Sequence, residues 1–524
     1  MPSTSIINRT VNPLLQGLPS WVERFRPEQI SGVGQILRAL DECDVVVLDA
    51  PTGSGKTLIA ETVRLMRQER SCYVCSSIGL QDQFVRDFRY ARVVRGRRNY
   101  KTGLFPKRHP YVSCDDCQWT RDDPRCRWCE SKRECPYEQA KIEAVGSELA
   151  VLNSAYALTE WNGPGRFSGR DLVVVDECDV FESAVMNHVS VTVTARRMAQ
   201  LGWLAPTKVT VESCWKDWLD QHIPILDRMV AGETVEKEAK TLGRLSGQLS
   251  TVRAHLERGI PYAYTGDDRR VEWKAAYVGD YCKEAVWKHG TKWLLMSATV
   301  ISSSSLLRGL GYTGEYRTIS LPSSFDRSKR PVYVRPSGNM KRSTKERDFE
   351  RLAAVVCQLV SETSERCVVH TVSYRLAADI SGRLRSELAR SGGGRTVVTY
   401  GMADGRAAAM VEYERTPGAV LVAPTADRGV DLPDGLCRRQ IIVKVPYPNM
   451  GDRMVRMRAY MGAEGRAWYA AVTVRTIVQM AGRGVRHDQD WCETFILDSQ
   501  FVEGVWSRSR MLFPQWFREA IIWE

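Results

Sequence analysis

The chain has 524 residues, of which 43% are hydrophobic and 26% charged, so wholesale disorder and fibrous repeats are excluded and three or four globular domains are expected. Its 74 lysines and arginines exceed its 62 aspartates and glutamates, which gives a formal net charge of +12. This excess favours a polyanionic partner, although it is equally consistent with a feature that only aids solubility.

The N-terminal sequence MPSTSIINRTVNP has no apolar stretch after a basic start, so we predict no secretory signal. No apolar run approaches the roughly 18 residues of a transmembrane helix. We therefore expect an intracellular protein that is not secreted and does not contact a membrane. Its 15 cysteines would then be reduced thiols and candidate metal ligands, not a disulfide framework.

Short β-branched runs, each followed by helix-like sequence, predict buried parallel strands with crossover helices. In the first half of the chain these runs are residues 45–48, 72–75, 149–152, 172–175 and 293–296. They predict one open α/β unit, made of residues 1–94, 146–181 and 286–315.

The segment APTGSGKT follows the first of these runs and precedes a helix-like sequence. In this context glycines let backbone N–H groups approach phosphates, and a helix N-terminus favours their charge. Lys56 would reach the β- and γ-phosphates of ATP, and Thr57 would bind Mg²⁺. The spacing and context favour this interpretation over a glycine-rich turn that binds nothing. The predicted phosphate site comprises Thr52, Gly53, Ser54, Gly55, Lys56 and Thr57.

Residues 95–145 interrupt the first unit with clustered cysteines, prolines and charges, and predict an inserted, loop-rich module. The spacing C-x2-C-x8-C-x2-C suits a zinc site, and a [4Fe–4S] cluster also takes four thiolates. Basic and aromatic residues nearby could contact nucleic acid, or the aromatic residues could form the module's own core. The candidate metal ligands are Cys114, Cys117, Cys126, Cys129 and Cys135.

The sequence LVVVDECD at 172–179 places Asp176 at the carboxyl end of a predicted strand, beside the phosphate loop. There Asp176 could hold Mg²⁺ through water, and Glu177 could polarise the attacking water. An acidic cluster after a strand is also a common helix N-cap. The P-loop upstream in the same predicted sheet favours the catalytic interpretation.

Residues 182–285 show helical spacing of apolar residues and charge-rich stretches such as ETVEKEAK, which predict a solvated helical insertion. A second set of strand-like runs follows residue 330. It predicts a second α/β unit, residues 316–524, in tandem with the first. These runs are residues 367–370, 396–399, 420–422, 441–445 and 494–497.

The sequence TIVQMAGRGVRH in the second unit would, on a helix, place Gln479, Arg483 and Arg486 on one face. The arginines could stabilise the charge on a transferring phosphoryl group. Gly482 and Gly484 inside that helix would imply close packing against another surface. A solvated basic face is the alternative. With arginines and P-loop in different units, ATP would lie in the cleft between them.

These motifs together resemble those of the superfamily 2 iron–sulfur DNA helicases of the XPD/Rad3/DinG type, in the family's order from Phe25 to Phe501. The sequence FRPEQ looks like the element that reads adenine, with Arg26 and Gln29. The sequence SSIGLQDQ is similar to motif Ia, and Ser297-Ala298-Thr299 to motif III. The sequence PTADRGVDLP resembles motif V, and the resemblance places Gly429 and Asp431 in the nucleotide site.

Two departures fall in the segment that occupies the DEAH-box position. Cys178 stands where the family has Ala, and Asp179 where it has His. These leave open how the box couples to its neighbouring motifs. A third departure concerns the metal: the family places its first ligand at the position of Thr102, so Cys114 or Cys117 would have to replace it.

The resemblance implies two RecA-like domains in a P-loop NTPase, with an iron–sulfur insertion at 95–145 and an arch-like insertion at 182–285. It implies a monomeric, ATP- and Mg²⁺-dependent helicase that translocates on single-stranded DNA, usually 5′ to 3′, and unwinds forked DNA. It favours a [4Fe–4S] cluster on four of the five cysteines, with zinc as the alternative. A translocase that does not unwind, and a zinc-stabilised ATP-gated DNA-binding module, are the alternative functions.

Overall fold

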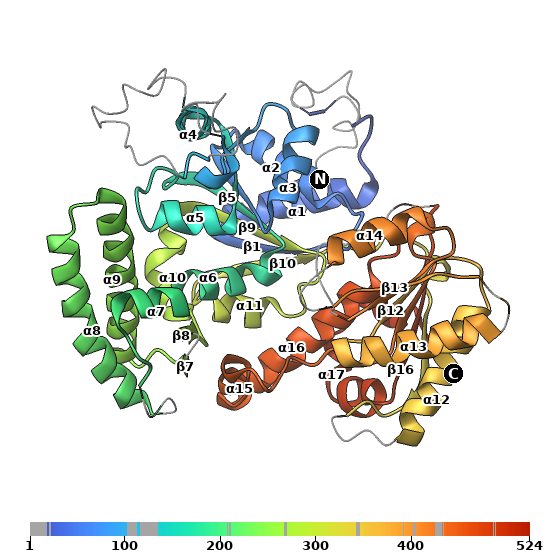
Figure 1. The fold of residues 1–524 in the computed structure, drawn as a ribbon. Coiled ribbons are helices and arrows are strands. Elements are labelled where there is room, and N and C mark those ends of the chain that lie inside the picture. The colour runs from blue at the N-terminus through green and yellow to red at the C-terminus, as the bar shows by residue number, and fades with distance from the viewer. Residues whose placement is uncertain are drawn as a thin grey trace.

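The structure is a computed structural model that describes residues 18–19, 22–101, 113–115, 135–206, 208, 211–266, 270–341, 346–390, 392, 394–401, 405–424, 432, 434–485, 487 and 489–524. Two α/β units lie next to one another, and a helical insertion extends from the first on the side away from the second (Figure 1). Among the described helices, none is long and apolar enough to cross a membrane.

The first unit is built on a seven-stranded sheet of order β10-β1-β9-β5-β2-β4-β3, in which every pairing is parallel. All five predicted strands are confirmed. The strands are β1 Val45–Asp49, β2 Ser71–Cys75, β3 Arg92–Val93, β4 Leu149–Asn153, β5 Arg170–Asp176, β9 Gly290–Ser297 and β10 Tyr316–Ser320. Its helices are α1 Pro27–Glu42, α2 Lys56–Arg67, α3 Ile78–Asp87, α4 Pro136–Gly146, α5 Ser154–Trp161, α6 Phe181–Val189, α10 Gly279–Ala285 and α11 Ser303–Gly309.

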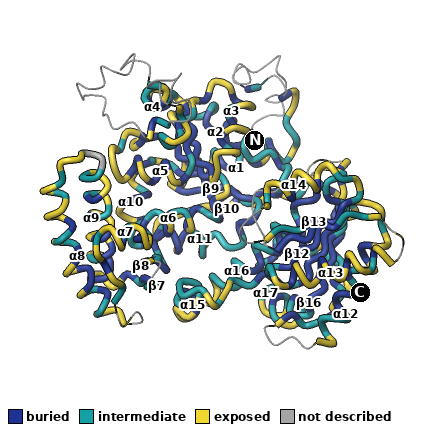
Figure 2. Tube along the Cα trace, viewed as in Figure 1, coloured by how far each residue is buried: buried dark blue, intermediate teal, exposed yellow. Residues whose placement is uncertain are grey.

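Both faces of this sheet are buried, which explains why its strands are continuous apolar runs. Along β1, Val45 and Val47 belong to one hydrophobic cluster, while Val46 and Leu48 belong to the cluster on the opposite face. Figure 2 shows both sheets as buried layers inside more exposed helices. Strand β10 pairs with β1, so the boundary expected at 315/316 lies too early and the first unit extends through residue 320.

The second unit has another seven-stranded sheet with parallel pairings, of order β13-β14-β12-β15-β16-β11-β17. Its five predicted strands are confirmed, and β11 and β17 are additional. The strands are β11 Val332–Gly338, β12 Cys367–His370, β13 Val397–Thr399, β14 Val420–Ala423, β15 Arg439–Ile442, β16 Glu493–Asp498 and β17 Ile521–Trp523. The helices are α12 Glu346–Ser361, α13 Tyr374–Arg390, α14 Arg406–Arg415, α15 Arg453–Ala459, α16 Gly462–Ala481, a π-helix Phe501–Trp506, α17 Ser507–Ser509 and α18 Gln515–Arg518.

We expected a helical insertion between α6 and α10, but the structure also contains strands there. Strands β6 Val191–Thr194, β7 Tyr262–Gly266 and β8 Arg270–Ala275 form an antiparallel sheet of order β6-β8-β7. The cause is local: VTVT alternates buried and exposed residues, and the other two strands carry buried aromatics. The predicted helices are present as α7 Ala195–Leu201, α8 Glu212–Gly232 and α9 Glu236–Glu257.

The helix expected to carry Gln479, Arg483 and Arg486 is shorter than predicted. Helix α16 ends at Ala481, and its C-cap residue Gly482 donates its N–H to the Val478 carbonyl at 2.9 Å. The two glycines therefore follow the helix rather than interrupt it. Arg483 lies beyond its end, so the expected single helical face is wrong; Arg486 lies outside the described residues.

Gly484 tests the close packing that the glycines implied. A Cβ there would overlap the side chain of Cys492, and the site is buried. We expect Gly484→Ala to destabilise the second unit by about 1–3 kcal/mol, because overpacked cores cost that much. The matched control is Gly382→Ala in α13, where no atom lies within 4 Å of the added Cβ. The measurement is thermal unfolding monitored by circular dichroism. Equal melting temperatures for the two variants would contradict this packing.

Candidate active site between the two units

The phosphate loop connects β1 to α2 at the carboxyl edge of the first sheet. Gly53 and Gly55 both adopt φ of +79°, a conformation that other residues rarely take. A Cβ on Gly55 would also collide with the Gln29 amide. Lys56 begins α2, and its Nζ donates to the carbonyls of Ala50 at 3.0 Å and Pro51 at 3.3 Å. The ammonium group thus lies across the loop, where a bound phosphate could take the place of these carbonyls.

Arg26 and Gln29 brace the phosphate loop from the start of α1. The Arg26 guanidinium donates to the Gly53 carbonyl at 2.9 Å, and the Gln29 amide donates to the Ser54 carbonyl at 3.0 Å. The Gln29 Oε1 atom accepts the Arg26 N–H at 2.9 Å. Both polar ends of Gln29 therefore hold a hydrogen bond within the protein, which fixes the orientation of its amide beside the phosphate loop.

The two residues expected to bind magnesium lie beside one another. The Tyr73 hydroxyl donates to Asp176 Oδ2 at 2.8 Å and also hydrogen-bonds to the Thr57 side chain. Burial raises the pKa of Asp176, while the nearby Lys56 ammonium opposes that increase. A divalent cation bound at this point would favour the ionised carboxylate in the same way.

Glu177 follows Asp176 in the left-handed conformation, with φ of +51°. This turn directs the exposed Glu177 carboxylate toward β2, where it accepts a hydrogen bond from the Ser76 hydroxyl. Ser76 opens the segment that resembles motif Ia. The candidate for polarising water therefore contacts a second loop of the same sheet edge.

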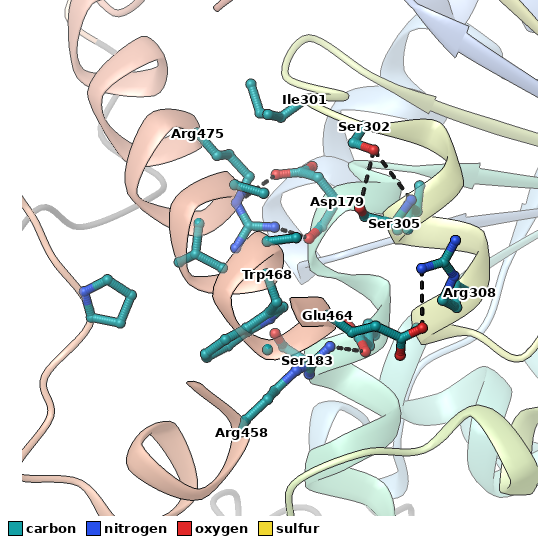
Figure 3. A pocket seen from close by; sticks show the side chains of 18 of the residues that line it. Asp179, Ser183, Ile301, Ser302, Ser305, Arg308, Arg458, Glu464, Trp468 and Arg475 are labelled. Carbon is teal, nitrogen blue, oxygen red and sulfur yellow. Dashed lines mark hydrogen bonds and ion pairs between the residues drawn. The ribbon is translucent and has the colours of Figure 1, made fainter. Parts of the chain in front are cut away.

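One buried carboxylate, Asp179, joins the two units. Its Oδ1 accepts the Ser297 hydroxyl at 2.7 Å, and its Oδ2 accepts the Thr299 hydroxyl at 3.3 Å. From α16 of the second unit, Gln479 Nε2 donates to the same Oδ2 at 3.0 Å and to the Thr299 Oγ1 at 3.1 Å. The Arg475 guanidinium donates to the Asp179 backbone carbonyl and lies 3.7 Å from its carboxylate (Figure 3).

This network shows how the structure accommodates Asp179 at the position where the resembled family has histidine. An ionised carboxylate has two oxygens that accept several donors at once, which a single imidazole cannot do. Asp179 therefore contacts both the Ser297-Ala298-Thr299 segment and the arginine-bearing helix. Sequence reasoning identified Gln479 but missed Arg475, which lies one helical turn earlier in an otherwise unremarkable stretch of helix.

A second set of contacts between the units surrounds a cavity of about 250 Å³ between α6 and α11 on one side and α15 and α16 on the other. Arg458 donates to Glu182, and its guanidinium lies 4.5 Å from the centre of the Trp468 ring. Near the solvent, Arg308 pairs with Glu464 at 3.1 Å (Figure 3). The Glu182–Arg458 pair is nearly buried, so it holds the two units in their relative position more strongly than an exposed pair would.

Of the predicted finger residues, Arg483 lies buried beside His370 at the end of β12. Burial lowers the pKa of His370 to about 4, and the Arg483 charge contributes to that decrease. Gln479, also of the predicted set, hydrogen-bonds to the first unit. Gly429, Asp431 and Arg486 lie outside the described residues.

Two of the five candidate metal ligands fall within the described part of the chain. Cys114 and Cys135 lie side by side before α4, their thiols joined by a hydrogen bond. Cys117, Cys126 and Cys129 lie outside it. The aromatic ring of Tyr100 packs against Tyr137 with 5.7 Å between ring centres, which supports a structural role for Tyr100 rather than base stacking.

A different group of possible ligands lies in the second unit. Oxygen and nitrogen atoms of Asp434, His487 and Asp490 lie within 4.8 Å of one another. Arg438 already pairs with the buried Asp490 at 2.5 Å, and His487 contacts Asp434 at 2.7 Å. The guanidinium neutralises the buried carboxylate, which makes this group a structural ion-pair cluster.

Comparisons with known proteins agree with this geometry. Residues 356–520 match the family described as helicase C-terminal domain. The chain is 31% identical over 120 residues to the regulator of telomere elongation helicase 1 homolog of Caenorhabditis briggsae, covering 20% of this chain and 12% of that protein. It is 28% identical over 138 residues to ATP-dependent DNA helicase CHL1 of Yarrowia lipolytica, covering 21% and 17%. The matches thus span less than a fifth of either relative.

The fold is similar to that of solved XPD structures. An XPD helicase has a TM-score of 0.62 at 15% identity, with 96% of this chain and 100% of that chain covered. The structure of Xpd4 from S. tokodaii has a TM-score of 0.58 at 13% identity, covering 95% and 100%. The fold is therefore that of two tandem RecA-like units, and the second unit carries the match to the helicase C-terminal domain.

Asp49, which sequence reasoning missed, gives the site a testable pH response. Burial raises its pKa to about 7, against the opposing Val300 N–H and Lys56 charge. The stability that comes from keeping this acid protonated is lost as pH rises through 7. We therefore expect the free energy of unfolding of Asp49→Asn, relative to that of the parental protein, to increase by about 2 kcal/mol between about pH 5.5 and about pH 8.

The measurement is the unfolding transition at both pH values, with Asp44→Asn, an exposed position before the same strand, as the control. A gain that is the same at both pH values would show that Asp49 does not titrate in this range.

Proposed function

We propose that the protein is an ATP-driven helicase that translocates on single-stranded DNA and separates forked duplex. The observation that carries this proposal is the Asp179 network, because it ties the box beside the phosphate loop directly to α16 of the second RecA-like unit. A change at the γ-phosphate could therefore alter the relative position of the two units. That is the movement a translocating motor requires.

In this proposal ATP binds to the phosphate loop with Mg²⁺ between Thr57 and Asp176. Lys56 neutralises the β- and γ-phosphates, and Glu177 orients the attacking water. Charge that develops during phosphoryl transfer is stabilised from the second unit. We assign that role to Arg483 and Arg486 with Gln479, and we assign Gly429 and Asp431 to the nucleotide side of the same unit.

A basic surface on the second unit supports a nucleic-acid track. Lys341, Arg375 and Lys444 follow strands β11, β12 and β15 and line one hollow at the carboxyl edge of the sheet. An adjoining hollow shares Lys341 and contains Tyr447 stacked on Tyr469, with 6.0 Å between the rings. Cations that contact phosphates and aromatic faces that stack on bases are the usual combination for single strands.

The direction of movement, 5′ to 3′, is proposed from the resemblance. Forked substrates with either a 5′ or a 3′ single-stranded arm test it, because only the 5′ arm should support strand displacement. DNA-stimulated ATP turnover without displacement on either substrate would favour a translocase that does not unwind. A failure of multiple turnover would favour an ATP-gated binding module.

We further propose that residues 95–145 carry a [4Fe–4S] cluster on four of the five cysteines, which would stiffen a module beside the first unit. The two described thiols support this, because Cys114 and Cys135 lie adjacent although they are 21 residues apart in the chain. Thiolate sites of this kind also suit zinc. Iron, sulfide and zinc analysis of anaerobically purified protein distinguishes the two metals.

Lys56→Ala tests the nucleotide site. We expect DNA-stimulated ATP turnover to be lost, because the ammonium contacts phosphate groups whose charge would otherwise stay uncompensated. Binding to single-stranded DNA should persist, since the proposed track lies on the other unit. The measurements are steady-state phosphate release and fluorescence anisotropy of labelled DNA, with the exposed Lys283→Ala as the control. Parental turnover in Lys56→Ala would refute the site.

Asp179→Ala tests the coupling between the units. The substitution leaves the buried hydroxyls of Ser297 and Thr299 and the partly buried Gln479 amide without their acceptor, at a cost of about 1–3 kcal/mol. We expect DNA-stimulated turnover to fall about 10- to 100-fold. ATP affinity should change little, because the hydrogen-bond partners of Asp179 named above lie outside the phosphate loop. Asp179→Asn keeps one acceptor and should retain more activity. Equal turnover in the alanine variant and the parental protein would remove Asp179 from the mechanism.

A further inference from the structure

The path of the chain between the first unit and α4 brings Cys114 back to the point where the cysteine-rich segment departs. Lys101 and Ser113 form an antiparallel β-bridge. Directly beyond it, the Cys114 N–H donates to the Tyr100 carbonyl at 2.8 Å, and the Cys114 thiol contacts the Lys101 carbonyl at 3.5 Å. Residue 114 therefore occupies the immediate neighbourhood of residues 100 and 101.

Cys135 meets Cys114 from the other end of the segment. It caps the N-terminus of α4, where its carbonyl accepts the Gln139 N–H at 2.9 Å. The thiols of Cys135 and Cys114 are reduced and hydrogen-bonded to one another, and Cys114 is only 2% exposed. Two adjacent sulfur atoms on separate backbone segments are what a metal centre with thiolate ligands requires.

The surroundings hold this pair in place. Arg97 lies 4.7 Å from the centre of the Tyr137 ring and pairs with Glu138 at 3.2 Å, which ties the entering segment to the first turn of α4. Tyr100 packs on the same ring. The positions of both thiols are therefore set by packing outside the segment between them.

We infer that Cys114, and not Cys117, is the first metal ligand of this module, together with Cys135. The Lys101–Ser113 bridge explains why the sequence can have Thr102 where a cysteine was expected, because the bridge places the Cys114 thiol beside Lys101. Cys117 is then the cysteine that the centre does not use. This inference deepens the proposed metal module and rests on it, but it is independent of the proposed motor activity.

The test compares Cys114→Ser, Cys117→Ser and Cys135→Ser in the full chain, purified anaerobically, by iron, sulfide and zinc content and by visible absorption. We expect the metal content of Cys114→Ser and Cys135→Ser to fall about tenfold or more. The reason is that even loss of an outer-shell partner weakens metal binding about 10- to 100-fold. Cys117→Ser should keep it. The matched control is Cys282→Ser, a fully buried thiol in α10.

Retention of metal by Cys114→Ser, with loss from Cys117→Ser, would overturn the inference. If Cys114→Ser does not fold, iodoacetamide labelling of the intact parental protein decides instead. Cys117 should be alkylated while the metal is bound; protection of Cys117 until the metal is removed would overturn the assignment. Metal content is read without ATP or DNA, so an inactive parental protein would reject the motor and leave the ligand result intact.

Discussion

The buried carboxylate of Asp179 is the group on which the arrangement of the two units depends. It receives donors from β9, from the loop after β9 and from α16, and its own backbone carbonyl accepts from Arg475. Ser297 and Thr299 are buried, so leaving either hydroxyl without its acceptor would cost about 1–3 kcal/mol. The second unit can occupy this position only while its helix supplies those donors. In the proposed mechanism, the network would link the occupancy of the nucleotide site to the relative position of the two sheets.

The topology of the first sheet explains why a few residues are enough to connect the two units. Strands β1, β9 and β5 are parallel neighbours, so the phosphate loop, the Ser297-Ala298-Thr299 segment and the acidic box all emerge at one edge. The second unit faces that edge with α16, and its α15 contacts α6 through the Glu182–Arg458 pair. Two separated contacts, one beside the nucleotide site and one beside the cavity, define an orientation better than either alone.

Much of the fold and of the phosphate site was predictable, because their signals are local. Continuous apolar runs indicated strands buried on both faces, and the glycine spacing at 53 and 55 indicated a loop with positive φ. Three features were not predictable. The strands of the insertion are only four to six residues long, Gly482 ends a helix whose pattern continues past it, and Arg475 acquires its role only from the other unit. Such tertiary contacts leave no periodic trace in the sequence.

The described end of the cysteine-bearing segment, from Cys135 into α4, is anchored to the first unit. In α4, Lys141 forms a buried ion pair with Glu160 of α5, and Arg170 of β5 donates to the carbonyls of Ala144 and Val145, at 3.1 Å each, and to that of Ser147 at 2.6 Å. The residues that hold Cys135 are thereby fixed to the central strands of the first sheet. A change in the cleft would then move the second unit against the first unit and α4 together. If the proposed motor moves a single strand across both units, that strand is displaced relative to Cys135 and α4, which stay with the first sheet.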